Sequence, residues 1–396
     1  MDKLTLREVA VNGQRVLVRV DYNVPIADGH VTDDTRIKAT LPTLDYLHAE
    51  KAKIIICSHF GRPNGEVVES ERLGIVVDHL RSITHIPVKY VTQTIGAEAT
   101  TAATHLRPGE ILVLENLRFH PGEESNDPAF AKALSAFGTL FVNDAFGAAH
   151  RAHASTSGIT QFLPAVAGLL MEKELTMLGS IISNPHRPVT AIIGGSKVSD
   201  KIDIISNLIR KVDNLLVGGG MVATFLKAQG YQVGASMVED NQLGTALQII
   251  QDASAAGVNL ILPVDLVVAN IFSSESSVRT VGVGEVPTGW FIMDIGSSTR
   301  ERFIDRIGFS STILWNGPLG VFEWQSFSNG TRVVAQAIAA QDEAVTVVGG
   351  GSTVEATRMF GISELIDHVS TGGGATLEFL EGRTLPGVDA LSDQNI

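Results

Sequence analysis

Residues 53–62 read KIIICSHFGR, an unbroken apolar run that ends in polar residues and a glycine. Nearly continuous apolar runs are typical of strands in a parallel sheet that is covered on both faces. Similar runs in the first half of the chain are Arg15–Asp21, Val88–Val91, Ile111–Glu115 and Leu140–Asp144. Because amphipathic, helix-like stretches such as Arg36–Lys51 lie between them, the first half predicts an α/β unit.

The second half of the chain repeats this alternation. Its expected strands are Val189–Gly194, Asn214–Val217, Asn259–Pro263, Phe291–Asp294, Thr312–Trp315 and Ala344–Val348. The pattern predicts a fold of two doubly wound lobes, each a parallel sheet with helices on both faces. The expected helix Met171–Ser183 is followed by two prolines, which would end it before residue 188. The predicted organisation is a first lobe at 1–170, an interdomain helix and linker at 171–187, and a second lobe at 188–384.

Composition narrows the class of protein. The 396 residues are 44% apolar and 18% charged, which is typical of a globular protein, and the formal net charge is −13. An acidic protein repels nucleic acid and anionic membranes, so neither is an expected partner. With one cysteine, Cys57, the chain can form no disulfide of its own, and its first residues contain no secretory signal. We expect a cytoplasmic protein.

Basic residues cluster at the predicted strand ends of the first half. They are Arg36, His59, Arg62, Arg118 and Arg151. A single arginine is usually a solvated surface residue, but five cations converging in an acidic protein indicate an anionic ligand. Arginine matches phosphate and carboxylate oxygens in a bidentate manner, so a small acid with a phosphate at its other end would fit. Asp21 and Asn23 could bind a hydroxyl group of this ligand, and His59 could instead be a buried structural histidine.

Glycine loops follow three predicted strands of the second half: 194–201 (GGSKVSDK), 218–220 and 349–353. Glycines allow backbone N–H groups to approach a phosphate, and we expect the first loop to open a helix with Lys197 and Lys201 one turn apart. The alternative is a tight turn with surface lysines. Neither a Walker A motif nor a dinucleotide fingerprint is present, which argues against a dehydrogenase. Three such loops in one sheet favour a nucleotide site.

At these residues the chain resembles the phosphoglycerate kinase family. The motifs that carry the resemblance occur in family order and span nearly the whole chain. They are 19–25 (RVDYNVP), 59–63 (HFGRP), 115–119 (ENLRF), 149–155 (AHRAHAS), 194–198 (GGSKV), 315–323 (WNGPLGVFE) and 370–375 (STGGGA).

The resemblance implies two Rossmann-like lobes joined by a hinge that closes, with residues 385–396 packing back on the first lobe. The first lobe would bind 3-phosphoglycerate and the second MgATP or MgADP, in a monomeric enzyme of glycolysis and gluconeogenesis. By motif position, the substrate residues would be Asp21, Asn23, Arg36, His59, Phe60, Gly61, Arg62, Arg118 and Arg151. The nucleotide residues would be Lys201, Gly296, Glu323, Gly350, Gly351, Ser352 and Thr353. Arg36 and Lys197 would be the catalytic pair that contacts the phosphoryl group in transit, and Glu323 would contact the ribose.

One residue departs from the family pattern. Ser352 stands where the family usually has an aspartate that is associated with the nucleotide-bound magnesium. Serine carries no charge, so the protein ligands of Mg²⁺ are not identified by the sequence. Since Mg²⁺ prefers phosphate oxygens and water, we expect activity with an altered metal dependence.

The expected reaction is phosphoryl transfer to a carboxylate. A carboxylate is already ionised at neutral pH and needs no general base, in agreement with a site rich in arginine and lysine. The alternative function is a catalytically weakened homologue that binds metabolites.

Overall fold

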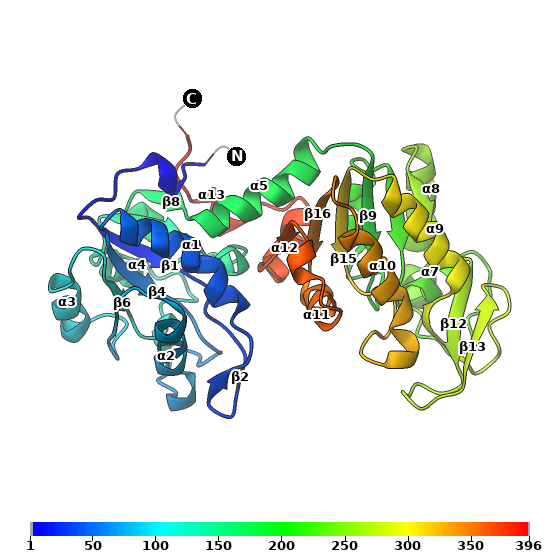
Figure 1. Ribbon diagram of the computed structural model, residues 1–396, viewed down its shortest axis with the longest axis horizontal. Coiled ribbons are helices and arrows are strands. Elements are labelled where there is room, and N and C mark those ends of the chain that lie inside the picture. The colour runs from blue at the N-terminus through cyan, green and yellow to red at the C-terminus, as the bar shows by residue number, and fades with distance from the viewer. Residues whose placement is uncertain (1–2, 395–396) are drawn as a thin grey trace. The chain divides into compact units, whose positions relative to one another are not determined.

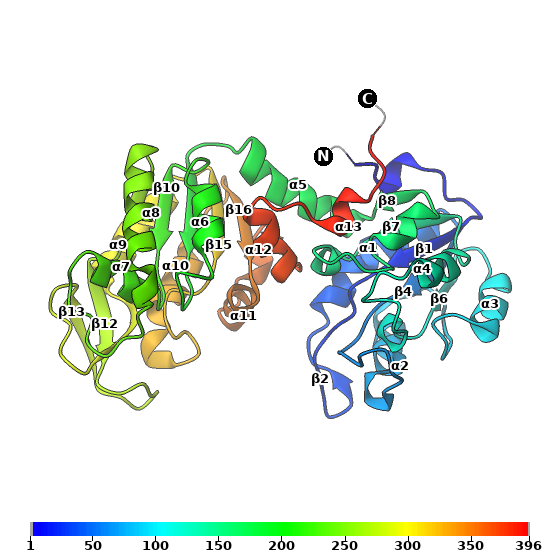
Figure 2. The same ribbon diagram turned by 180° about the vertical axis from the view of Figure 1, so that it is seen from behind.

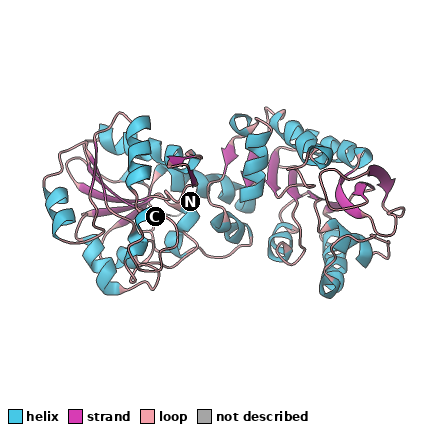
Figure 3. Cartoon of the chain, turned by 90° about the horizontal axis from the view of Figure 1, so that it is seen from below, coloured by secondary structure: helices cyan, strands magenta, loops and turns pink. Residues whose placement is uncertain are grey.

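The computed structural model describes residues 3–394 and divides them into two compact units. One unit runs to Thr176 and includes the segment from Thr384 onward; the other is Met177–Arg383. The division falls within helix α5 (Leu169–Ser183). Each unit has strands at its centre and helices on either side of them (Figure 3).

The first unit is built on a six-stranded sheet in the order β5-β6-β4-β1-β7-β8, with every pair parallel. Its strands are β1 (Arg15–Arg19), β4 (Lys53–Cys57), β5 (Val88–Tyr90), β6 (Ile111–Val113), β7 (Leu140–Asn143) and β8 (Ala165–Ala167). A short antiparallel hairpin is formed by β2 (Ile26–Ala27) and β3 (His30–Val31).

Helices cover both faces of this sheet. They are α1 (Thr35–Ala49), α2 (Gly74–Ile83), α3 (Ala97–Thr104), α4 (Pro128–Ser135) and the short α13 (Pro386–Asp389). Leu44 of α1 and Val77 of α2 pack in one buried cluster with Ile54 and Ile56 of β4. Since neighbouring residues of a strand point to opposite faces, Ile55 faces the other layer. Its complete burial explains why the run at 53–57 is apolar throughout.

The C-terminal segment belongs to the first unit. Ser392 accepts a backbone hydrogen bond of 2.8 Å from Leu4, and the Gly387 N–H donates one of 2.8 Å to Ala149. The Asn143 amide, at the end of β7, donates to the Gly387 carbonyl over 2.9 Å. In Figure 2, α13 lies beside the strands β7 and β8.

The second unit contains a parallel sheet in the order β11-β10-β9-β15-β16-β17. Its strands are β9 (Val189–Ile193), β10 (Asn214–Val217), β11 (Asn259–Ile261), β15 (Thr312–Asn316), β16 (Val345–Gly349) and β17 (His368–Val369). Its helices after α5 are α6 (Ile202–Leu208), α7 (Val222–Ala228), α8 (Leu243–Ala255), α9 (Ser297–Gly308), α10 (Asn329–Ala339), α11 (Gly351–Met359) and α12 (Gly374–Leu380). Helices α9 and α10 cover one face, and α6, α7 and α8 cover the other (Figures 1 and 2).

One predicted strand belongs to a different sheet. The run Phe291–Asp294 forms β14 (Phe291–Ile295), which pairs antiparallel with β12 (Asp265–Ala269) in a three-stranded sheet completed by β13 (Val278–Gly282). The expectation that it joins the parallel sheet was therefore wrong. The reason is that the backbone of β14 pairs with β12, which runs in the opposite direction. In this register Val267 of β12 lies opposite Asp294 of β14. Within residues 3–394, no helix is both long and apolar enough to cross a bilayer.

Candidate active site

The polar residues predicted in the first unit follow the carboxyl ends of its central strands. Asp21 and Asn23 follow β1, residues 59–62 follow β4, Arg118 follows β6, and Arg151 follows β7. The chain order reverses between β1 and β7 in this sheet. Ligands of open α/β sheets bind at such a reversal, outside the carboxyl ends of the strands.

Asp21 and Asn23 hold Arg36. The Arg36 Nη1 atom lies 3.1 Å from Asp21 Oδ2 and donates a 3.0 Å hydrogen bond to the Asn23 carbonyl. Asp21 is buried, whereas the Arg36 side chain keeps 34% of its surface exposed. This anchoring leaves the other guanidinium N–H groups available to an anion.

The loop after β4 is fixed by amide groups. The Gly61 N–H donates to Asn23 Oδ1 over 3.0 Å, and Arg118 Nη1 donates to the Gly61 carbonyl over 2.7 Å. Asn116 accepts from the Phe60 N–H over 3.1 Å and donates to the Phe60 carbonyl over 2.7 Å. The sequence prediction did not assign a function to Asn116, although it lies within the quoted motif at 115–119. The structure thus brings Asn23, Phe60, Gly61 and Arg118 together.

A buried network behind His59 was missed by sequence reasoning. Arg19 is 1% exposed, and its Nη2 lies 3.1 Å from His59 Nδ1 while its Nε donates to Ser155 Oγ over 2.8 Å. Ser155 donates in turn to the buried carboxylate of Glu123. Burial, followed by the charge of Arg19, lowers the pKa of His59 well below its ordinary value. His59 is therefore neutral near pH 7, which corrects its place among the five expected cations.

The other three predicted arginines differ in their exposure to solvent. Arg62 is exposed, and within the described chain its side chain has no hydrogen bond or ion pair. Arg151 is half-buried, and its Nε donates to His150 Nε2 over 3.2 Å. Arg118 is only 4% exposed and forms an ion pair of 2.9 Å with Glu124. Burial lowers the pKa of the Arg118 guanidinium.

In the second unit, a cavity of about 820 Å³ lies at the carboxyl ends of four adjacent strands. It is lined by the segments that follow β9, β10, β15 and β16, including Gly194–Lys197, Asp200, Lys201 and Gly350–Thr353. The chain order reverses between β9 and β15, so the position again follows the rule for open α/β sheets. Phe272 and Phe291 supply apolar lining.

Glycine is required where two of these segments touch. A side chain on Gly194 would place its Cβ 2.0 Å from the Pro318 carbonyl oxygen, and one on Gly317 would place it 2.1 Å from the Gly194 oxygen. Gly317 also has a φ of +100°, which side chains disfavour. The loops after β9 and β15 can pack so closely only because both residues are glycine.

Both predicted lysines line the cavity, but in a different local structure from the one expected. Helix α6 begins at Ile202, so Lys197 and Lys201 are not one helical turn apart. The Glu239 carboxylate accepts hydrogen bonds from the backbone and hydroxyl of Ser199, at the start of a turn over residues 199–201 that precedes the helix. Lys197 is exposed, whereas Lys201 is partly buried and its Nζ donates to Asn316 Oδ1. Burial lowers the pKa of Lys201.

Most other predicted nucleotide residues also line the cavity. Glu323, Gly350, Gly351, Ser352 and Thr353 do so, and Thr353 Oγ1 accepts the Gly317 N–H over 2.7 Å. Gly296 is not among the lining residues: it packs against Asp265, whose carboxylate accepts the N–H groups of Ser298 and Thr299 at the start of α9. Asn316 is a lining residue that the sequence prediction left out.

Protein ligands for a metal are sparse. Within residues 3–394, no group of three histidine, cysteine, aspartate or glutamate side chains is placed to hold an ion. Ser352 and Thr353 bring hydroxyl groups to the cavity, and the nearby Thr353 hydroxyl already accepts from Gly317. The lining also includes Asp200 and Glu323, and this donor set suits an ion that arrives on phosphate oxygens with its own water.

Comparison with known proteins identifies the family. The family model for phosphoglycerate kinase matches residues 6–383. The chain belongs to the phosphoglycerate kinase family. It is 53% identical to the phosphoglycerate kinase of Herpetosiphon aurantiacus and 52% identical to that of Moorella thermoacetica, each over the full length of both chains.

Solved structures of phosphoglycerate kinases agree with the fold. The enzyme from Coxiella burnetii matches with a TM-score of 0.90 at 39% identity, and that from Pyrococcus horikoshii OT3 with 0.82 at 31%. Both comparisons cover 98% of each chain. The prediction of a two-lobed α/β phosphoglycerate kinase is confirmed.

Proposed function

We propose that this chain catalyses reversible phosphoryl transfer between MgATP and the carboxylate of 3-phosphoglycerate, forming MgADP and 1,3-bisphosphoglycerate. Family membership supports the reaction class, and the observation that carries the assignment is the pair of clusters at the carboxyl ends of the two parallel sheets. One cluster is rich in arginine, and the other is a glycine-lined cavity with two lysines.

The first unit binds the acid. Arg62, Arg118 and Arg151 suit the phosphate end, because guanidinium groups donate to phosphate oxygens in pairs. Asp21 and Asn23 orient the hydroxyl group and keep Arg36 in place. Neutral His59 contributes a hydrogen bond from Nε2 and no charge, since its Nδ1 faces the Arg19 guanidinium.

The second unit binds the nucleotide. Residues Gly350–Thr353 at the start of α11 and Lys201 contact the phosphates, and Glu323 contacts the ribose. The N-terminal end of α11 adds a favourable partial charge for an anion. Magnesium enters as part of the nucleotide substrate, bound to phosphate oxygens and water, where it neutralises charge on the phosphates.

The chemical step needs positioning and charge stabilisation. The attacking carboxylate is ionised at neutral pH, so no side chain has to remove a proton. Arg36 and the exposed Lys197 stabilise the negative charge on the equatorial oxygens of the moving phosphoryl group. Arg36 and Lys197 belong to different units, and the proposed mechanism includes a ligand-dependent closure that excludes water from the acyl phosphate. Scattering profiles that are identical with and without both ligands would contradict closure.

The deciding experiment is a coupled assay of ATP-dependent consumption of 3-phosphoglycerate. The wild-type chain should turn over, and Lys197→Ala should lower kcat about a hundredfold or more with little change in KM for either substrate. Lys227→Ala is the matched control, because Lys227 pairs with Asp240 and does not line the cavity. Binding of both ligands without turnover in the wild-type chain would instead indicate a metabolite-binding homologue.

We further propose a monomer that works in the cytoplasm, as a glycolytic enzyme does. The single cysteine is buried, so no disulfide links two copies through it in the folded state. Sedimentation analysis at working concentrations should give a single species of about 42.1 kDa.

A further inference from the structure

Two cations lie side by side at the amino end of the first unit's sheet. Arg15 begins β1, Lys53 begins β4, and the two residues are register partners in this parallel pair. Register partners of neighbouring strands point to the same face of a sheet, so the positive charges are adjacent. Within residues 3–394, neither side chain has a hydrogen bond or an ion pair. An uncompensated pair of cations in a protein of net charge −13 indicates a place for an anion.

An open recess of about 410 Å³ lies against these cations. It is lined by Gly13, Gln14, Arg15, Lys53, Thr104 and Thr139. The Thr139 hydroxyl already donates to Gln14 Oε1 over 3.0 Å. The charged groups that remain available in the recess are therefore Arg15 and Lys53.

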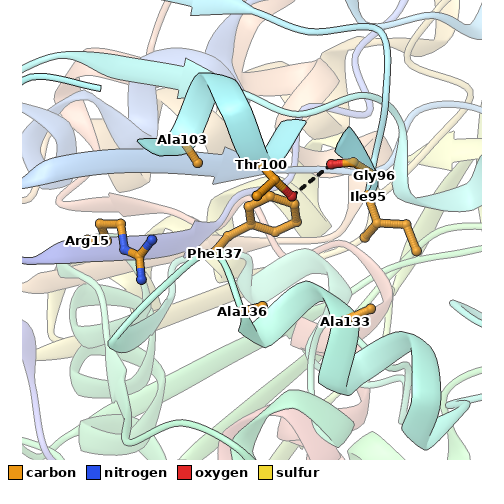
Figure 4. Close-up of a pocket in the computed structure, with 8 residues that line it drawn as sticks. All are labelled: Arg15, Ile95, Gly96, Thr100, Ala103, Ala133, Ala136 and Phe137. Atoms are coloured by element: carbon orange, nitrogen blue, oxygen red, sulfur yellow. Dashed lines mark hydrogen bonds between the residues drawn. The ribbon is translucent and has the colours of Figure 1, made fainter. Parts of the chain in front are cut away.

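A second, smaller cavity also has Arg15 in its wall and is otherwise lined mainly by apolar residues. It measures about 230 Å³, lies between α3 and α4, and is lined by Ile95, Ala103, Ala133, Ala136 and Phe137 together with Arg15. Figure 4 shows Arg15 at one end of this cavity and Ile95 at the other, with the Phe137 ring between them. The Thr100 hydroxyl donates to the Gly96 carbonyl over 2.8 Å, so it is already paired within the wall.

The combination of a cationic recess and an apolar cavity that share Arg15 selects an amphipathic ligand. A cavity of roughly 150 Å³ lined by apolar side chains can hold a benzene ring, so 230 Å³ accommodates one ring. The planar guanidinium of Arg15 matches a carboxylate on a short arm from that ring, and Lys53 adds a second positive charge.

We propose that the amino end of the first unit's sheet is a binding site for a small carboxylate that carries one aromatic ring. The ring lies against Phe137 between α3 and α4, and the carboxylate lies between Arg15 and Lys53. The site is distinct from the proposed active site, which follows the opposite ends of the same strands. Along β1 alone, Arg15 and Arg19 are separated by about 13 Å.

The probe for this site is 4-fluorophenylacetate, observed by ¹⁹F NMR in the presence of the full-length protein. We expect saturable binding with a dissociation constant of about 1 mM, in the range of a ligand of this size. Saturating 3-phosphoglycerate and MgADP should not displace it. Displacement by either would place the probe in the active site and overturn the proposal.

Three variants test the assignment of residues. Arg15→Gln should weaken binding about tenfold or more, and Ala133→Leu should also weaken it by filling the ring cavity. Lys38→Gln is the control, since Lys38 is an exposed lysine of the same unit that pairs with Asp34. Unchanged binding in Arg15→Gln, or equal binding of uncharged 4-fluorobenzyl alcohol to the wild type, would refute a carboxylate site. If Ala133→Leu fails to fold, the Arg15→Gln and alcohol results still decide.

Discussion

The Nδ1 atom of His59 lies 3.1 Å from Nη2 of the buried Arg19. A guanidinium can only donate, so Nδ1 accepts and the imidazole proton resides on Nε2. That nitrogen lies 3.9 Å from Asp21 Oδ1. The arrangement makes His59 a neutral hydrogen-bond donor that lies between Arg19, the last residue of β1, and Asp21, which follows it.

We expect His59 to stay neutral throughout the working pH range. Burial and the charge of Arg19 both lower its pKa well below the ordinary value. Nitrogen-detected NMR of the free protein should show the Nε2–H tautomer from pH 6 to pH 8. A His59 midpoint near 6.5 would contradict the arrangement.

His153 should make the protein less stable in mild acid. Burial and the neighbouring arginines lower its pKa to about 4. The unfolded chain therefore binds a proton that the folded chain rejects, and the free energy of unfolding falls as the pH drops below about 6.5. Urea unfolding at pH 7 and pH 5 should show a smaller decrease for His153→Gln than for the wild type. Equal decreases in the two proteins would exclude this contribution.

Asp294 should have the opposite effect. It is buried beside the cavity segment at Gly320, accepts the Gly330 N–H over 2.7 Å, and has a pKa raised by burial to about 7. The folded chain then retains a proton that the unfolded chain loses, so this residue's contribution to stability declines as the pH rises from about 4 through 7. Asp294→Asn keeps an acceptor for Gly330 and removes the titration.

Relative to the wild type, Asp294→Asn should gain stability as the pH rises from 4 to 8, by at most about 4 kcal/mol. Urea unfolding of both proteins over this range measures the difference. Asp252→Asn is a control, because Asp252 is an exposed aspartate on α8. A stability difference that does not vary with pH would show that Asp294 is ionised throughout.

Ser352 should affect the Mg²⁺ concentration that the reaction requires more than the phosphoryl transfer itself. The residue is exposed in the first turn of α11, where it lines the cavity of the second unit without adding charge. In Ser352→Asp, a carboxylate there should lower the Mg²⁺ concentration that gives half-maximal rate, measured at fixed ATP. Ser352→Ala should resemble the wild type. Identical magnesium titrations for the wild type and Ser352→Asp would refute this prediction.

The sequence was most informative where one pattern indicates both the fold and the position of the site residues. Apolar runs that end in polar residues or glycine predicted both parallel sheets and placed Asp21, Arg118 and Lys201 at strand ends. The antiparallel position of Phe291–Asp294 was not predictable in this way. Its apolar run looks like that of a parallel strand, and β13, at the other edge of the same three-stranded sheet, is mostly exposed and has no such run.

Arg19 shows why the remaining site residues were missed. In the run 15–19 it reads as an ordinary polar residue of a strand, yet it is buried because Ser155, 136 positions later, and Glu123 complete its surroundings. Such pairing over long sequence distances is decided by tertiary packing and not by local pattern. The same holds for Asn316, whose contact with Lys201 spans 115 positions.

The return of residues 384–394 to the first unit gives the chain the connectivity of a domain insertion. The sequence of the second unit interrupts that of the first. Asn143 binds the Gly387 carbonyl, and Leu4 binds that of Ser392, across 244 and 388 positions of chain. During synthesis from the N-terminus, the whole of the second unit must therefore be made before the first can close its last backbone hydrogen bonds. The first unit therefore begins first on the ribosome and is finished last.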